Sequence, residues 1–165
     1  MIVRLDHQLS HDLGPEAAKE FRFAVVVSRF NESITSNLRR AALRTLKEHG
    51  CLDENVQQFE VPGAFEIPFL AKMLAESGRH DAIICLGCVI RGETPHFDYI
   101  CQWVAHGIGQ VGLASGVPTI FGVITADTLE QAVARSSDNP ANKGAEAAIT
   151  AIDLTCLVHN LDFKQ

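Results

Sequence analysis

Short apolar runs alternate along this chain with amphipathic stretches of helical period. The first run, residues 23–28, is too apolar for a half-exposed strand and too short for a helix, which predicts a buried parallel strand. In residues 32–49, apolar side chains recur at helical spacing, basic side chains occupy the opposite face, and Gly50 supplies a stop. This stretch predicts an amphipathic helix.

The same alternation continues toward the C-terminus. Further strands are predicted at residues 56–61, 82–90 and 118–125, and further helices at residues 65–77, 95–115 and 142–158. Before the last helix, Asp127 or Thr128 can cap a short helix, with Glu130 and Gln131 placed for reciprocal capping. Strands and helices in strict alternation imply right-handed crossovers and a parallel sheet of about four strands with helices on both faces. The predicted fold class is therefore α/β, a three-layer α/β/α sandwich.

The length of 165 residues fits one globular domain, and 47% hydrophobic with 21% charged residues excludes intrinsic disorder as the main state. We expect residues 1–165 to form that single domain, with residues 1–21 as an N-terminal tail or edge segment. The formal net charge of −6 argues against broad binding of nucleic acid or of an anionic membrane, because such partners require a cationic surface. An anionic ligand would have to be held by a few local cations.

Cysteine usage and the N-terminal segment both bear on the cellular compartment. The five cysteines are odd in number and lie mostly in apolar runs, which disfavours a secreted disulfide framework. Residues 1–20 have neither the basic nor the apolar region of a signal peptide, and no apolar stretch reaches the roughly 20 residues of a spanning helix. A soluble protein in the reducing cytoplasm is expected.

In open parallel sheets, ligands bind beyond the carboxyl ends of the strands. Four segments follow the predicted strands: residues 29–33, 62–66, 91–96 and 126–128. The third is the richest, since Thr94 is a predicted N-cap and Pro95 a predicted first helical residue. Gly92 lets the chain turn, so free N–H groups around Glu93 and Thr94 converge at the positive end of the helix dipole. That spot suits a phosphate group.

His96, Glu66 and Phe30 are the side chains of these segments that could do chemistry. His96 lies beside the predicted anion site, where an imidazole could act as a general acid or base; the alternative is a solvated surface histidine. Gly63 permits close approach of a ligand and Glu66 can accept hydrogen bonds, the alternative being a plain tight turn. Phe30 could stack on a flat heterocycle or pack on a neighbouring helix or subunit.

Two short motifs match known site patterns but do not fit their context. Residues 107–112 read G-x-G-x-x-G, yet a predicted helix precedes them and too few residues follow for a crossover helix. These glycines are expected to let two helices approach closely. Cys85 and Cys88 have redox or zinc spacing, but positions three apart on a strand face opposite sides of a sheet, so both are expected to be small core residues.

Histidine pairs also fall short of a metal site. His7 with His11, and Cys101 with His106, stand close together along the chain. Neither pair is joined by a second cluster that would complete a tetrahedral set, so no metal is assigned.

Four sequence blocks, taken in order, resemble the lumazine synthase family. They are Ser-Arg-Phe-Asn-Glu at residues 28–32, Val-Pro-Gly-Ala-Phe-Glu-Ile-Pro at residues 61–68, Gly-Cys-Val-Ile-Arg-Gly-Glu-Thr-Pro-His-Phe-Asp-Tyr at residues 87–99 and Phe-Gly-Val-Ile-Thr at residues 121–125. The resemblance covers about residues 23–157 without large gaps. It implies a flavodoxin-like sandwich and an enzyme of riboflavin biosynthesis. The implied reaction condenses 5-amino-6-(D-ribitylamino)uracil with 3,4-dihydroxy-2-butanone 4-phosphate, giving 6,7-dimethyl-8-ribityllumazine, phosphate and water, without a cofactor or metal.

The resemblance also implies roles for individual residues. His96 matches the histidine that transfers protons. The aminouracil-binding positions are Phe30, which stacks on the ring, then Ala64, Phe65, Glu66, Cys88, Val89 and Ile90, and Phe121, which lines the site from an adjacent subunit. The phosphate-binding positions are Glu93 and Thr94, through backbone donors, with Arg135 and Lys143.

Quaternary structure is a further implication of the resemblance. Family members form homo-oligomers built from pentamers with active sites at subunit interfaces, and riboflavin synthase is a candidate protein partner. Some pentamers pair into decamers or assemble sixty-subunit shells. Residues 136–144 keep the length of a glycine-rich turn associated with shells but carry Pro140 and have lost most of its glycines. We therefore expect a pentamer or decamer.

Two other functions remain open at this point. The same fold class hosts flavin-binding oxidoreductases, since fold alone does not set function. A non-catalytic homologue could instead bind ribityl-bearing ligands or serve as an assembly subunit. The presence of Phe30, His96 and Arg135 argues against this second alternative.

Overall fold

The computed structural model describes residues 13–161, which alternate strands and helices. The elements are β1 (Phe23–Ser28), α1 (Glu32–Glu48), η1 (Asp53–Asn55), β2 (Val56–Val61), η2 (Ala64–Glu66), α2 (Ile67–Glu76), β3 (Ala82–Ile90), α3 (His96–Ser115), β4 (Thr119–Ala126), α4 (Leu129–Ser136) and α5 (Lys143–Asn160). Every predicted strand and helix is confirmed, with ends that differ by a few residues. The largest difference is that the second predicted helix begins as a 3-10 turn, η2.

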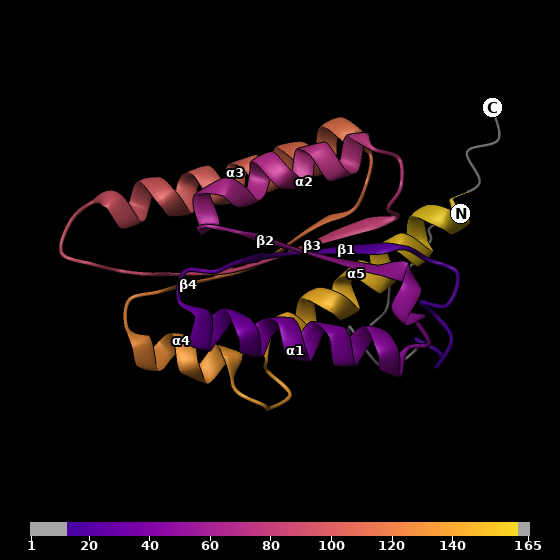
Figure 1. Cartoon of the computed structure of the whole chain (residues 1–165), viewed down its shortest axis with the longest axis horizontal. Helices are drawn as coiled ribbons and strands as arrows, with labels where there is room; N and C mark the ends of the chain where they lie inside the picture. Colours follow the sequence, from indigo (N-terminus) through magenta and orange to yellow (C-terminus); the bar gives the residue numbers. More distant parts are fainter. Residues whose placement is uncertain (1–12, 162–165) are drawn as a thin grey trace, which may run out of the picture.

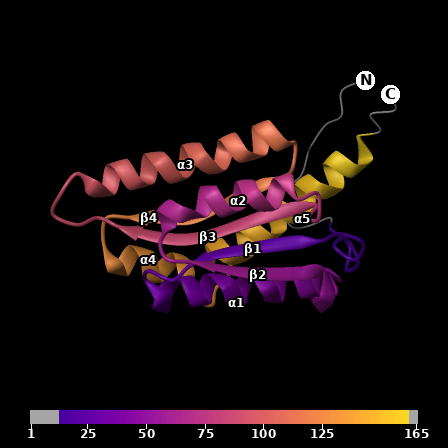
Figure 2. The ribbon, with the colours of Figure 1, turned by 45° about the horizontal axis from the view of Figure 1, so that its top comes forward.

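The four strands form one parallel sheet in the order β2-β1-β3-β4. Helices α2 and α3 cover one face, and α1, α4 and α5 cover the other (Figure 1). This arrangement confirms the predicted α/β/α sandwich with a flavodoxin-like strand order. Because all strands run in the same direction, their carboxyl ends meet at one edge of the sheet. At that edge, the loop from β3 to α3 projects at the left of Figure 2.

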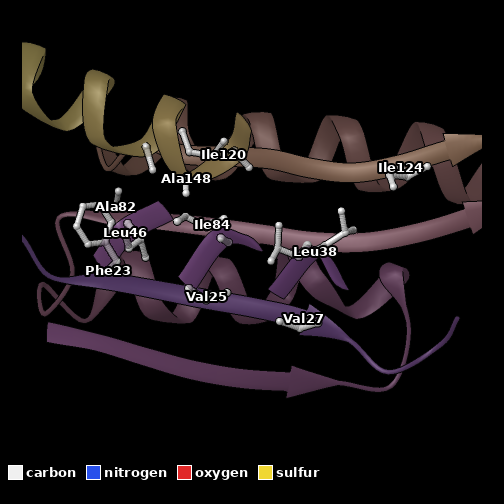
Figure 3. Close-up of a cluster of buried hydrophobic side chains, with 14 of the residues drawn as sticks. Phe23, Val25, Val27, Leu38, Leu46, Ala82, Ile84, Ile120, Ile124 and Ala148 are labelled. Atoms are coloured by element: carbon white, nitrogen blue, oxygen red, sulfur yellow. The ribbon is translucent and has the colours of Figure 1, made fainter. Parts of the chain in front are cut away.

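The sheet separates two cores. Strand β1 is buried along its whole length, as predicted, and its alternate residues face opposite sides. Phe23, Val25 and Val27 pack with α1 and α5, as Figure 3 shows with Leu38 and Ala148. The residues between them on β1 pack in the second core, beneath α2 and α3. Both faces of β1 are therefore anchored, which fixes where its carboxyl end lies.

Close helix packing explains the glycine motif at residues 107–112. A Cβ atom on Gly107 would lie 2.7 Å from Cβ of Pro68, so the absence of a side chain lets α3 approach α2. Gly109 of the same motif has nothing within 4 Å of that position, so the expectation holds for Gly107 and not for Gly109. Cys85 and Cys88 are buried in opposite cores, as expected.

The N-terminal segment lies partly outside the described residues. Residues 15–20 form turns, and Ala18 is fully buried with its N–H donating to the carbonyl of His49 at 2.9 Å. His7 and His11 fall outside residues 13–161. Within that range, no helix is long and apolar enough to cross a membrane, and no three metal-ligating side chains gather.

Candidate active site

A cleft of about 360 Å³ opens at the carboxyl edge of the sheet. It is lined by Phe30, Asn31, Gly63, Ala64, Phe65, Cys88, Val89, Ile90, Gly92, Thr94, His96, Phe97 and Ile100. Three of the four segments singled out from the sequence, 29–33, 62–66 and 91–96, thus converge on one cavity. The fourth, 126–128, does not line it. Its Asp127 side chain instead accepts a hydrogen bond from Arg91, the first residue of the third segment.

The segment after β1 supplies an exposed aromatic ring and a strained residue. Phe30 is 71% exposed, so its ring faces solvent and the cleft rather than the core. Asn31 follows with φ 60°, in the left-handed region that asparagine tolerates better than most residues. Its amide Nδ2 donates to the carbonyl of Cys88 at 3.0 Å, which ties the end of β1 to the end of β3. Sequence reasoning missed this residue.

The turn after β2 is held from two sides. The Glu66 carboxylate accepts the Gly63 N–H at 2.9 Å, so one of its oxygens is used within the turn and the other is available. Trp103 of α3 donates its indole N–H to the carbonyl of Phe65 at 3.0 Å and stacks on the Phe65 ring at 5.2 Å between centroids. The turn is therefore positioned by a side chain of α3 that lies 38 positions further along the chain.

The end of β3 forms the floor of the cleft. Cys88 is 2% exposed, and burial raises the pKa of its thiol to about 11. Burial also raises the pKa of Cys85. Both thiols therefore stay protonated at neutral pH and are poor nucleophiles. Cys88, Val89 and Ile90 carry no charged side chain, so polar contacts from this part of β3 can come only from its backbone, of which the Cys88 carbonyl already accepts Asn31.

The loop between β3 and α3 differs from the prediction in how the helix begins. Pro95, not Thr94, occupies the N-cap position, and its carbonyl accepts the N–H of Asp98 at 3.0 Å. The Thr94 hydroxyl makes no capping bond, because proline at φ −61° already adopts a helical backbone and takes over the start of the helix. His96 is consequently the first residue of α3, exposed on the wall of the cleft.

Backbone donors in this loop are unused. Within the described residues, the N–H groups of Gly92, Glu93 and Thr94 donate to no protein acceptor. They lie at the N-terminus of a 20-residue helix, where the helix dipole adds positive potential. The amides of residues 92–94 are therefore free of protein acceptors, and this does not depend on a Thr94 cap. Their convergence on one anion stays a prediction.

Arg91 is the second residue at this edge that sequence reasoning missed. Its guanidinium donates to Asp127 at 2.8 Å and to the two carboxylate oxygens of Asp98 at 3.1 and 3.4 Å. Hydrogen bonds to these carboxylates raise its pKa, so it stays charged. Its central carbon also lies 4.2 Å from the centre of the Phe97 ring. Its sequence signals were its position directly after a buried strand and its place in the block of residues 87–99 that resembles the lumazine synthase family; neither indicated its partners.

Five predicted site residues are not among those that line this cleft: Glu66 and Glu93, whose segments border it, and Phe121, Arg135 and Lys143, which belong to β4, α4 and α5. Phe121 and Lys143 line a separate cleft of about 490 Å³ between β4 and α5. Lys143 pairs with Glu146 at 2.5 Å, and Arg135 of α4 donates to the carbonyl of Gln131 at 2.9 Å. Within one copy of the chain, the three residues of β4, α4 and α5 are not brought together with His96.

Comparison with known families gives this geometry a context. Residues 20–159 match the model of the 6,7-dimethyl-8-ribityllumazine synthase family. The chain belongs to this family. The match spans every strand and every residue of the cleft, so the lumazine synthase resemblance seen in the four sequence blocks is confirmed. Membership of the 6,7-dimethyl-8-ribityllumazine synthase family places the chain among transferase-type enzymes of riboflavin biosynthesis, with small-molecule substrates and an oligomeric assembly.

Proposed function

We propose that this protein catalyses the condensation of 5-amino-6-(D-ribitylamino)uracil with 3,4-dihydroxy-2-butanone 4-phosphate to 6,7-dimethyl-8-ribityllumazine, in the cytoplasm. The observation that carries the proposal is the cleft at the carboxyl edge of the sheet. There, an exposed aromatic ring, backbone groups of two strand ends, unused loop amides and His96 surround one cavity. The family match supports the same reaction.

The aminouracil fits the side of the cleft formed by β1, η2 and β3. Phe30 would stack on the planar ring, because its face is exposed and not packed against the core. Backbone groups of Ala64 and Phe65, the free oxygen of Glu66, and backbone groups of residues 88–90 would bind the polar edge of the ring. Phe121 of a neighbouring subunit would cover the opposite side.

The phosphate fits the other side. Free N–H groups of Glu93 and Thr94 at the start of α3 would donate to its oxygens. The cations that balance its charge, Arg135 and Lys143, would come from a neighbouring subunit, because in a single copy they lie outside the cleft. We therefore propose that each active site is built at a subunit interface within a pentamer, or a decamer of two pentamers.

The chemistry needs proton transfer and orientation more than a strong nucleophile. An amine of the aminouracil attacks the ketone and water leaves to give an imine; phosphate is then eliminated, and the second amine closes the ring with loss of water. His96 is placed beside the free amides, where it can move protons to and from the leaving phosphate. Most of the acceleration would come from holding the two substrates together, and we propose no cofactor or metal in these steps.

The test is to mix the purified protein with both substrates and follow lumazine fluorescence, omitting the phosphate substrate as the control. We expect product only when both substrates are present. Absence of product in the complete mixture would contradict the proposal and favour a non-catalytic binding or assembly role. A flavin spectrum in the purified protein together with absence of product would favour a flavin-binding protein instead.

A further inference from the structure

The loop that carries the proposed phosphate site and His96 has little backbone support of its own. Residues 92–94 donate no main-chain hydrogen bond to the protein within the described residues, and their side chains are exposed. The last ladder bond before the loop runs from the Arg91 N–H to the carbonyl of Ala126 at 2.9 Å. A loop whose amides are left free for a ligand must be held in place by other groups.

Those groups meet at the guanidinium of Arg91. Its two terminal nitrogens bond the two oxygens of Asp98, at 3.1 and 3.4 Å, and its Nε bonds Asp127 at 2.8 Å. The planar group also lies over the ring of Phe97, 4.2 Å from its centre. Phe97 is 9% exposed and lines the cleft, so this stack reaches the wall of the active site.

The placement of these partners makes them a clamp on the loop. Arg91 precedes the loop and Asp98 follows it, in the first turn of α3, so the two-pronged ion pair joins the loop at its two ends. Asp127 belongs to the connection between β4 and α4 and ties that closed loop to the next strand. A guanidinium can hold three such partners at fixed angles, whereas a lysine ammonium cannot.

We propose that Arg91 is a positioning residue that, through Asp98, Asp127 and Phe97, holds the loop of residues 92–96 in the geometry that binds the substrate phosphate and aims His96. The inference rests on the proposed function. Arg91 is not itself a phosphate ligand, because three of its donors are engaged by carboxylates. The single positive charge of Arg91 is also balanced by the carboxylates of Asp98 and Asp127, so it leaves no net positive charge to attract a phosphate.

The substitution that tests the clamp is Arg91→Lys, which keeps the positive charge and removes the fork and the stack. Loss of geometry in this loop is expected to raise the KM for the phosphate substrate about tenfold and to lower kcat by about tenfold. The KM for the aminouracil, whose contacts lie on the other side of the cleft, should stay within about twofold. Unchanged kinetics, or an equal rise of both KM values, would overturn the proposal.

Arg22→Lys is the matched control. Arg22 also makes a two-pronged bond to an aspartate, Asp81, at 3.2 and 3.3 Å, but at the amino end of the sheet, away from the cleft. Arg22→Lys should lower the free energy of unfolding about as much as Arg91→Lys does, and it should leave kcat and both KM values unchanged. If Arg22→Lys altered the kinetics in the same way as Arg91→Lys, the effect would be a general loosening of the fold and the clamp would be refuted.

Hydrogen exchange separates failure of the clamp from failure of the proposed function. The amides that close the two ends of the loop are bonded: the N–H of residue 91 donates to the Ala126 carbonyl and the N–H of Asp98 to the Pro95 carbonyl. Both should exchange faster in Arg91→Lys than in the wild type, while amides of β1 and β3 keep their rates. This readout needs no substrate. If the wild type formed no lumazine, the proposed function would fail and exchange would still decide about the clamp. Equal exchange of the amides of residues 91 and 98 in both proteins would refute the clamp even in an active enzyme.

Discussion

Each end of the parallel sheet has an arginine whose guanidinium donates two hydrogen bonds to one aspartate, yet the backbone hydrogen bonds around the two pairs differ. At the amino end, the Arg22–Asp81 pair is joined by two backbone bonds: the Asp81 N–H donates to the Arg22 carbonyl, and the Arg22 N–H donates to the Asp81 carboxylate, both at 2.7 Å. At the carboxyl end, the Arg91–Asp98 pair encloses a loop whose amides donate to nothing within the described residues.

This difference indicates which backbone N–H groups are available to bind a ligand. A buried N–H without a partner costs free energy, whereas an exposed N–H, such as those of residues 92–94, can bond water until a ligand replaces it. At the amino end, the backbone N–H groups of Arg22 and Asp81 have partners within the protein, so this pair serves stability. The carboxyl end holds its loop by side chains instead, which leaves the main chain open for binding. Substitutions at the carboxyl end should therefore change kinetics, and substitutions at the amino end should change stability.

The largest kinetic effect is expected at His96. His96→Ala should lower kcat about 100-fold without abolishing activity, because general acid–base catalysis supplies only part of the acceleration. The His96 side chain is exposed and makes no hydrogen bond with the described residues. The unfolding midpoint of His96→Ala in urea should therefore match that of the wild type. A kcat equal to the wild-type value in steady-state assays would remove His96 from the mechanism.

Arg135 should affect binding of the phosphate substrate rather than turnover. Arg135→Ala should raise the KM for that substrate by about 30-fold with kcat little changed, because about 2 kcal/mol of charge-assisted hydrogen bonding is lost. Steady-state kinetics with each substrate varied in turn measures this split. A rise in the KM for the aminouracil alone would contradict the assignment.

Mixed assemblies extend the Arg135 experiment to the interface. The His96→Ala and Arg135→Ala proteins are unfolded together and the mixture is refolded. If His96 and Arg135 of one active site come from different subunits, some interfaces of the mixed oligomers then contain both wild-type residues. Activity at low phosphate substrate should then exceed that of either variant refolded alone. Activity equal to the average of the two variants would place both residues on the same subunit.

A smaller effect is expected at Trp103, which supports the aminouracil side of the cleft. Trp103→Phe retains an aromatic ring against Phe65 and removes the donor to its carbonyl. Loss of about 1 kcal/mol in the positioning of this turn should raise the KM for the aminouracil about fivefold. The KM for the phosphate substrate, measured in the same assay, is the internal control and should not move. If both KM values changed together, the turn would not be specific to the aminouracil.

The smallest effect belongs to the amino end and concerns pH. Burial lowers the pKa of His80, whose Nε2 lies 2.9 Å from Oε1 of Gln57. The unfolded chain, with a histidine pKa near 6.5, binds this proton more readily than the folded chain, so the free energy of unfolding falls as pH drops below that value. The slope from one such group is at most about 1.4 kcal/mol per pH unit.

Denaturant unfolding of the wild type and of His80→Gln at pH 8 and pH 5.5 tests this. The wild type should lose more stability than His80→Gln on acidification, while kcat at pH 8 stays the same in both. His106→Gln, at an exposed histidine, is the control and should follow the wild type. Equal acid sensitivity of wild type and His80→Gln would show that another group governs the acid limb.

Much of the fold follows from local patterns in the sequence. The valine-rich run that becomes β1 and the amphipathic run that becomes α1 carry their own period, so their limits were predicted almost to the residue. The rule that ligands bind at the carboxyl edge then located the cleft. Of the two predicted caps, Thr128 is the one that caps α4, by accepting the N–H of Gln131, and the Gln131 side chain accepts the N–H of Asp127. These contacts could be predicted because they lie within five residues of the chain.

What the sequence did not reveal depends on contacts between distant residues. Arg91 bonds Asp127, 36 positions away in the chain, and Asn31 bonds Cys88, 57 positions away. No local sequence pattern predicts either pair. The Thr94 cap was predicted wrongly because the rule for N-caps ignores that proline can itself occupy that position. The roles of Phe121, Arg135 and Lys143 depend on a second copy of the chain, so they remain proposals.

The measurement that tests the central claim most directly is the stoichiometry of the reaction at the carboxyl-edge cleft. Lumazine absorbance and inorganic phosphate are followed together in the wild type with both substrates present. The proposed condensation predicts one phosphate released for each lumazine formed, and neither product when either substrate is omitted. Phosphate released without lumazine, or no release of either, would contradict it.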